Sequence, residues 1–65
     1  METRIVETSY GEVELRNVMI DSNGFDLTEG IEIEGDEIDV IEIYGYYDID
    51  SLSVEEIEEL IEDNM

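Results

Sequence analysis

The sequence has no cysteine, histidine, lysine, proline or tryptophan. The absence of cysteine excludes a disulfide and a thiolate metal site. Without histidine and cysteine, the chain also lacks the side chains that most often act as catalytic base or nucleophile. Arg4 and Arg16 are its only basic side chains, and two cations are too few to neutralise a nucleic-acid backbone. We therefore expect neither an enzyme nor a protein that binds nucleic acid directly.

Long apolar runs are absent as well. No segment approaches the roughly 20 apolar residues of a membrane span. The first residues, Met1 to Arg4, lack the basic and apolar segments of a signal peptide. We expect a cytoplasmic protein that does not contact a membrane.

Negative charge dominates the residues that are present. The 65 residues include 21 acids and have a net charge of −19, whereas a magnitude of about 2–8 serves the solubility of a small domain. Residues 1–20 carry four acids and both arginines, and residues 21–65 carry the other 17 acids and no base. Because 42% of the residues are hydrophobic and regularly spaced, we expect one folded domain over residues 1–65 rather than a disordered chain.

Alternating apolar and polar residues, as at Val13 and Leu15, predict strands with one buried face. Residues 10–11 and 21–24 carry turn signals. The apolar residues shift from odd positions, such as Leu15, to even positions, such as Val18, near residues 17–18. This shift predicts a bulge or burial on both faces of the strand. The strands are expected at about residues 4–9, 12–20, 31–34 and 37–44.

A helix is expected at about residues 54–63. Ser53 followed by Glu56 has the spacing of a capping box, which marks a helix start. The apolar stripe of this helix consists of Val54, Ile57, Leu60 and Ile61. The predicted fold is therefore α+β, a small antiparallel sheet of about four strands with one C-terminal helix packed on it.

A hairpin is predicted with Gly35-Asp36 as its two-residue turn. This turn opposes Ile33 with Ile38 and Ile31 with Val40 on one face of the sheet. The other face then carries only acids, namely Glu32, Glu34, Glu37 and Asp39. Like charges directly opposite each other destabilise a sheet, so this arrangement indicates that the acids serve binding rather than stability.

Aromatic residues are few. Residues 25–30 are expected to form a loop that Phe25 and Leu27 anchor to the core. Tyr44 is expected in the core, and Tyr46 or Tyr47 at an interface, where tyrosine often anchors a partner.

Calcium binding would require a suitable loop. Asp48, Asp50 and Glu59 have the spacing of positions 1, 3 and 12 of an EF-hand. Leu52 and Ser53, however, fall where the third ligand and the glycine of the turn are required. We expect no specific metal site and no cofactor.

The motif Asp50-Ser51-Leu52 resembles that of the acyl carrier proteins, whose serine carries phosphopantetheine at the start of a helix. Those proteins are four-helix bundles, whereas residues 1–47 here have the pattern of strands. The motif is interpreted instead as the approach to the helix N-cap.

Small size, high acidity and the lack of cations resemble the phage-encoded DNA mimics, which include anti-restriction proteins, anti-CRISPR proteins and uracil-DNA glycosylase inhibitors. The resemblance implies a non-enzymatic inhibitor in a bacterial host cell that mimics the DNA phosphate backbone. Its expected partner is a strongly basic DNA- or RNA-binding protein of host defence (CRISPR or restriction) or DNA repair. The expected partner-binding residues are Glu32, Glu34, Glu37, Asp39, Glu42, Asp48, Asp50, Glu55, Glu58, Glu59, Glu62, Tyr46 and Tyr47.

Other interpretations remain open. An immunity protein or antitoxin against a basic nuclease, and an acidic chaperone of a basic protein, would use the same physics. Halophilic adaptation also replaces lysine with acids, but it should not leave residues 1–20 close to neutral. The sequence also leaves open whether two copies associate into a homodimer, which would lengthen the charge array.

Overall fold

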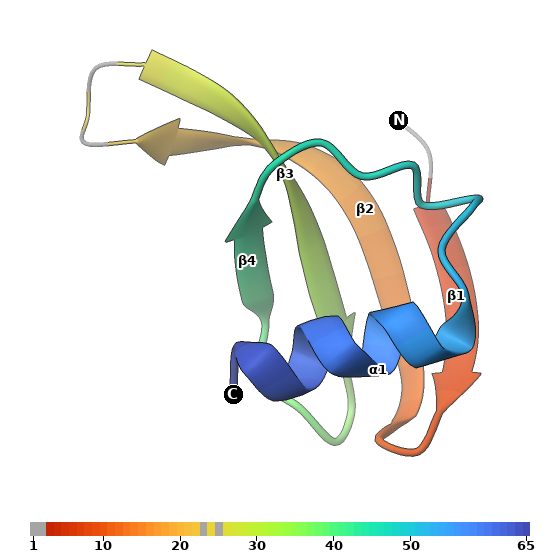
Figure 1. Ribbon diagram of the computed structural model, residues 1–65. Coiled ribbons are helices and arrows are strands. Elements are labelled where there is room, and N and C mark those ends of the chain that lie inside the picture. Colours follow the sequence, from red (N-terminus) through yellow and green to blue (C-terminus); the bar gives the residue numbers. More distant parts are fainter. Residues whose placement is uncertain (1–2, 23, 25) are drawn as a thin grey trace.

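The computed structural model describes residues 3–22, 24 and 26–65, which form a four-stranded antiparallel sheet and one helix (Figure 1). The strands follow one another in the sheet in the order β1-β2-β3-β4. The elements are β1 (Thr3–Thr8), β2 (Gly11–Ser22), β3 (Asp26–Gly35), β4 (Ile41–Tyr44) and α1 (Val54–Asp63). The predicted α+β class, sheet and C-terminal helix are confirmed.

Alternation along the strands places the core on one face of the sheet, here called the inner face. Val6 lies opposite Val13, and Leu15 lies opposite Ile33, which in turn lies opposite Ile41. All five of these side chains are buried in a single cluster. The helix lies across this face and adds two fully buried side chains to the cluster, while the hairpin of β2 and β3 extends beyond the helix (Figure 1). These two side chains are Ile57 and Ile61.

The helix begins where its cap predicts. Ser53 Oγ accepts a hydrogen bond of 3.1 Å from the Glu56 amide, and Glu56 Oε1 accepts one of 2.9 Å from the Ser53 amide. Of the predicted apolar stripe, Ile57 and Ile61 are buried and Leu60 is half-buried. Val54 is 41% exposed, so it does not belong to the stripe.

The connection between β4 and α1 crosses the inner face, and two polar side chains of the sheet fix its path. The Asn17 amide donates to the carbonyl of Tyr47 over 3.0 Å. Arg4 donates through Nη1 to the carbonyls of Ile49 and Leu52, each over 2.7 Å. These contacts seal the edge of the core beside Ile49, which is itself 1% exposed.

The predicted hairpin at Gly35-Asp36 is wrong. Residues 36–40 form a longer connection, and β4 pairs three residues further along the chain, with Ile33 opposite Ile41. This register buries Ile41, while Val40 is 53% exposed. Between β3 and β4 it also leaves one like-charged cross-strand pair, Glu32 with Glu42, in place of the two that the predicted turn creates. The observed pairing therefore reduces repulsion within the sheet.

Two other expectations change. Residues 26–30 belong to β3 rather than to a loop, and Leu27 is 65% exposed instead of anchored in the core. Phe25 and Asn23, on which part of the loop and turn predictions fell, lie outside the described residues. The pairing of β2 with β3 continues without a break through residues 17–18, so no bulge is present there. Burial on both faces is confirmed, because Ile20 is buried on the face opposite the core.

Candidate protein-binding surfaces

The face of the sheet opposite the helix, here called the outer face, is acidic. Cross-strand pairs place Arg16 between Glu14, Glu32 and Glu34 on this face. The outer face carries Glu7, Glu12, Glu14, Glu32, Glu34 and Glu42. Glu32 and Glu34 are thus neighbours on one face, as the alternation predicts.

A single cation neutralises part of the outer face. Arg16 Nε donates to Glu32 Oε1 over 3.0 Å, and its Nη2 donates to Glu34 Oε1 over 2.7 Å. Arg16 also forms ion pairs with Glu14 and Glu32 through its Nη atoms. The hydrogen bonds that Arg16 donates to Glu32, and then to Glu34, raise the pKa of Arg16 above its ordinary value. Glu32 and Glu34 therefore have an internal partner that the sequence analysis missed.

A second acidic group, here called the helix row, consists of Glu55, Glu59, Glu62 and Asp63 on the solvent side of α1, all exposed. The predicted Glu58 lies at the edge of this row and is half-buried, since its Oε2 accepts a hydrogen bond of 2.7 Å from the Ser9 amide. Among the described residues, no arginine forms an ion pair with the helix row. The carboxylates of the helix row are thus not paired with an arginine of the same chain in the part that the structure describes.

The remaining predicted acids lie in connections. Glu37 and Asp39 are exposed in residues 36–40, not on a strand face. Asp48 closes a turn, because its Oδ2 accepts from the Ser51 hydroxyl over 2.9 Å and its Oδ1 accepts from the Asp50 amide over 3.2 Å. Asp50 is exposed beside it. Asp48 therefore has a structural role that explains its position in the sequence.

The tyrosines are distributed differently from the prediction. Tyr44 is 55% exposed on β4, so its expected place in the core is wrong. Tyr46 is 76% exposed. Tyr47, the alternative interface residue, packs against the core instead. Tyr46 is therefore the tyrosine of this pair that is available to a partner.

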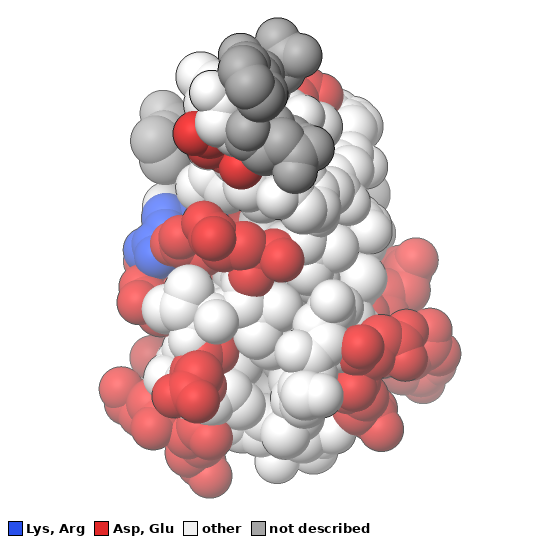
Figure 2. All heavy atoms as spheres, turned by 90° about the vertical axis from the view of Figure 1, so that its left-hand side faces the viewer, with Lys and Arg blue, Asp and Glu red and all other residues white. Residues whose placement is uncertain are grey.

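The expected binding residues do not form one surface. The strand acids and the helix glutamates were expected to bind the partner together, but α1 packs on the inner face, whereas Glu32, Glu34 and Glu42 project from the outer face. Figure 2 shows most of the acidic side chains toward the two margins of the view, with mostly uncharged side chains between them. The protein thus presents two acidic surfaces on opposite sides of the sheet.

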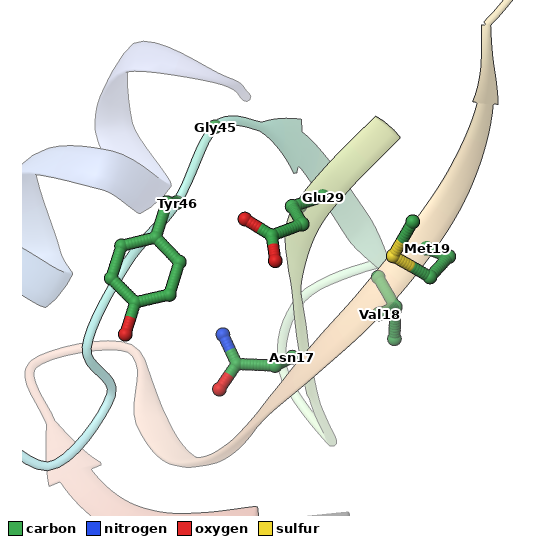
Figure 3. A pocket seen from close by; sticks show the side chains of 7 residues that line it. Asn17, Val18, Met19, Glu29, Gly45 and Tyr46 are labelled. Atoms are coloured by element: carbon green, nitrogen blue, oxygen red, sulfur yellow. The ribbon is translucent and has the colours of Figure 1, made fainter. Parts of the chain in front are cut away.

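A pocket lies where the β2–β3 hairpin meets the chain leaving β4. Its volume is about 290 Å³, and Glu29, Met19 and Tyr46 lie around it (Figure 3). Because a loop was expected over residues 25–30, the position of Glu29 on β3 beside Tyr46 was not predicted. Leu27 and Thr28, which pair with β2, are the residues that could have indicated this strand. Their strand preference is outweighed by Gly30 and the neighbouring acids, which are residue types depleted in strands.

Over the described ranges, no group of three or more acidic side chains is placed to hold a metal ion. No helix in the part of the chain that the structure describes is long and apolar enough to span a membrane. No family model matches the sequence, no curated protein is significantly similar to it, and no solved structure matches the fold.

Proposed function

We propose that the chain is a non-enzymatic inhibitor that occupies the basic nucleic-acid-binding surface of a host defence (CRISPR or restriction) or DNA-repair protein. Its carboxylates take the place of backbone phosphates. Arginine and lysine side chains that bind phosphate also form charge-assisted hydrogen bonds with carboxylates. Attraction between oppositely charged surfaces additionally speeds association.

The observation that carries this proposal is the charge density of the helix. The six acids from Glu55 to Asp63 span about 12 Å of helix axis, at about 1.5 Å per residue, so the helix carries roughly one charge per 2 Å. Duplex DNA carries one charge per about 1.7 Å of its axis. A basic groove meets the four acids of the helix row, roughly one charge per 3 Å, which is within about twofold of the charge spacing of DNA.

Internal contacts of the arginines support the same proposal. Arg4 binds two carbonyls on the inner face, and Arg16 binds three glutamates on the outer face. Both cations are thus engaged within the fold. We assign the main contact to the helix row, because Arg16 weakens the field of the outer face.

Affinity capture tests the proposal. The tagged protein is incubated with bacterial lysate at about physiological salt, where exposed charges are screened beyond roughly 8 Å. Bound proteins are identified by mass spectrometry and then challenged with duplex DNA. We expect one nucleic-acid-binding defence or repair protein to be retained and to be displaced by DNA.

Two variants with equal charge changes locate the contact. E55Q/E59Q/E62Q removes three carboxylates from the helix row, and E7Q/E12Q/E42Q removes three from the outer face without touching the partners of Arg16. We expect the first variant to weaken binding at least about tenfold more than the second, since a charged hydrogen bond is worth roughly 1.5–3 kcal/mol. Equal weakening by both variants would show that net charge alone determines binding.

Other results would favour the other functions. Retention of a toxic nuclease whose activity the chain neutralises in its own host would indicate an immunity protein. Retention of many basic proteins in proportion to their abundance would indicate a chaperone. Either outcome would contradict the inhibitor proposal.

A further inference from the structure

The pocket beside Tyr46 combines an apolar wall with one carboxylate. Figure 3 shows the Glu29 carboxylate directed into the space in front of the Tyr46 ring, with Met19 and Val18 on the opposite side. Glu29, Met19 and Tyr46 are all exposed, so a partner can reach them. The pocket is lined by Asn17, Val18, Met19, Glu29, Gly30, Gly45 and Tyr46.

Two hydrogen bonds, one between backbone groups and one from the Asn17 side chain, hold the two sides of the pocket in place. The Gly45 amide donates to the Glu29 carbonyl over 2.9 Å, which ties the chain leaving β4 to β3. The Asn17 amide donates to the Tyr47 carbonyl and so fixes the segment that carries Tyr46. Gly45 has φ of 127°, a conformation that side chains other than glycine rarely adopt. Glu29 and Tyr46 therefore face each other from a defined backbone.

The size and chemistry of the pocket limit what it can hold. A volume of about 290 Å³ lies at the lower limit of small-molecule sites, which measure roughly 300–1,000 Å³. This volume suits one long side chain. An apolar wall accepts the aliphatic stem, the Tyr46 ring accepts a planar cation by stacking, and Glu29 accepts its hydrogen bonds. Arginine combines these properties, and arginine is enriched among the side chains that anchor interfaces.

A second copy of this chain does not supply that arginine. Arg4 and Arg16 both bind groups within their own fold. Two copies with a net charge of −19 each also repel one another. The charge therefore favours a basic partner.

We propose that this pocket receives one arginine side chain of the partner protein, with the guanidinium paired to Glu29 and stacked on Tyr46. The inference rests on the proposed function, because that function supplies the basic partner. The pocket gives the interaction a defined anchor, whereas the helix row supplies attraction over a longer range. An inhibitor that is not a uniform polyanion can thereby discriminate among basic surfaces.

Peptide titration tests the pocket without any target protein. The probes are acetyl-Gly-X-Gly-amide peptides in which X is arginine, lysine or leucine, added to ¹⁵N-labelled protein at about 0.15 M salt. The readout is the amide chemical shift of each residue. We expect saturable shifts at Glu29, Gly30 and Gly45, with arginine bound at least about fivefold more tightly than lysine.

Matched variants separate the pocket from general charge. E29Q should weaken arginine binding about tenfold, whereas E42Q, which removes the same charge from the outer face, should change it less than about twofold. Y46A should weaken binding about two- to fivefold, and Y44A should leave it unchanged. All four residues are exposed, so their replacement leaves the core intact.

Three results would overturn the inference. Shifts spread over all acidic residues, equal for arginine and lysine, would mean diffuse attraction. Leucine binding as tight as arginine binding would mean a purely apolar pocket, and the absence of saturable shifts would mean no pocket. Because the titration uses no lysate, its failure is distinguishable from failure of the capture experiment on which the proposed function depends.

Discussion

The side chain of Ile20 occupies the space above Gly30, in which any side chain at position 30 would lie. A Cβ atom at Gly30 would collide with Ile20 Cδ1 and would lie 2.7 Å from the Ile43 carbonyl oxygen. Ile20 is 8% exposed even though it projects from the outer face, away from the helix. Gly30 thus allows the sheet to bury an apolar residue on each side at this point.

Replacing Gly30 with alanine should therefore destabilise the protein. Overpacking of this kind reduces the free energy of unfolding by about 1–3 kcal/mol, and a backbone carbonyl cannot move away as a side chain can. Urea unfolding of G30A at fixed salt measures the effect. T28A, at an exposed position of the same strand, is the control and should change stability by less than about 0.5 kcal/mol. A neutral G30A would mean that β3 is displaced from the position described.

Arg4 should stabilise the fold through hydrogen bonds rather than through an ion pair. R4M keeps an unbranched apolar stem but leaves the carbonyls of Ile49 and Leu52 without their donor. We expect a loss of about 1.5–3 kcal/mol in the free energy of unfolding, measured by urea denaturation. R4K retains one donor group and should lose less. If R4M and R4K were equally destabilised, the shape of the guanidinium would be the decisive property.

Salt should increase the stability of this protein, because screening relieves repulsion among its acids. R16Q should be less stable than the parent at low ionic strength, since Glu14, Glu32 and Glu34 then lose their shared cation. The difference between the two proteins should narrow as NaCl rises to about 1 M. Thermal unfolding across this range tests both statements. A difference that stays constant with salt would assign Arg16 a packing role instead.

Alkaline pH should weaken the contact between α1 and the β1–β2 turn. Burial, followed by the charges of Glu62 and Glu58, raises the pKa of Tyr10. A raised pKa in the folded state contributes stability that is fully present below the ordinary tyrosine pKa of about 10 and is lost as pH rises through the raised value. Y10F should therefore lose less stability than the parent above about pH 10. Y46F, altered at an exposed tyrosine, should behave like the parent.

Local sequence patterns predicted an element correctly where only one pattern was present. Ser53 and Glu56 form the predicted cap, and the alternation at Val13 and Leu15 gives a strand with one buried face. The pairing of β3 with β4 was predicted wrongly because two sets of alternating apolar residues follow Gly35, namely Ile38 with Val40 and Ile41 with Ile43. The fold pairs the set that contains Ile41 with β3. Only the burial and the charge repulsion in the folded sheet decide between the two sets.

The candidate site was predictable in composition but not in arrangement. The acids of the helix row follow directly from the helical period. The hydrogen bond from Arg16 to Glu32 depends on the register of β2 with β3, which neither strand specifies by itself. The approach of Tyr46 to Glu29 depends on the path of the chain after β4. That path is fixed by the distant Asn17, and the sequence offered no periodic signal for it.

The contacts of Arg4 join residues that are separated by 45 and 48 positions in the sequence. At ribosomal rates of about 5–20 residues per second, roughly 2–10 s pass between synthesis of the arginine and synthesis of its acceptors. During this interval the apolar face of the growing sheet has no helix to cover it. Residues 21–65 add 17 acids and no base, so neighbouring nascent chains become strongly negative as they lengthen and repel one another. The charge that opposes folding thus also protects unfinished copies from aggregation.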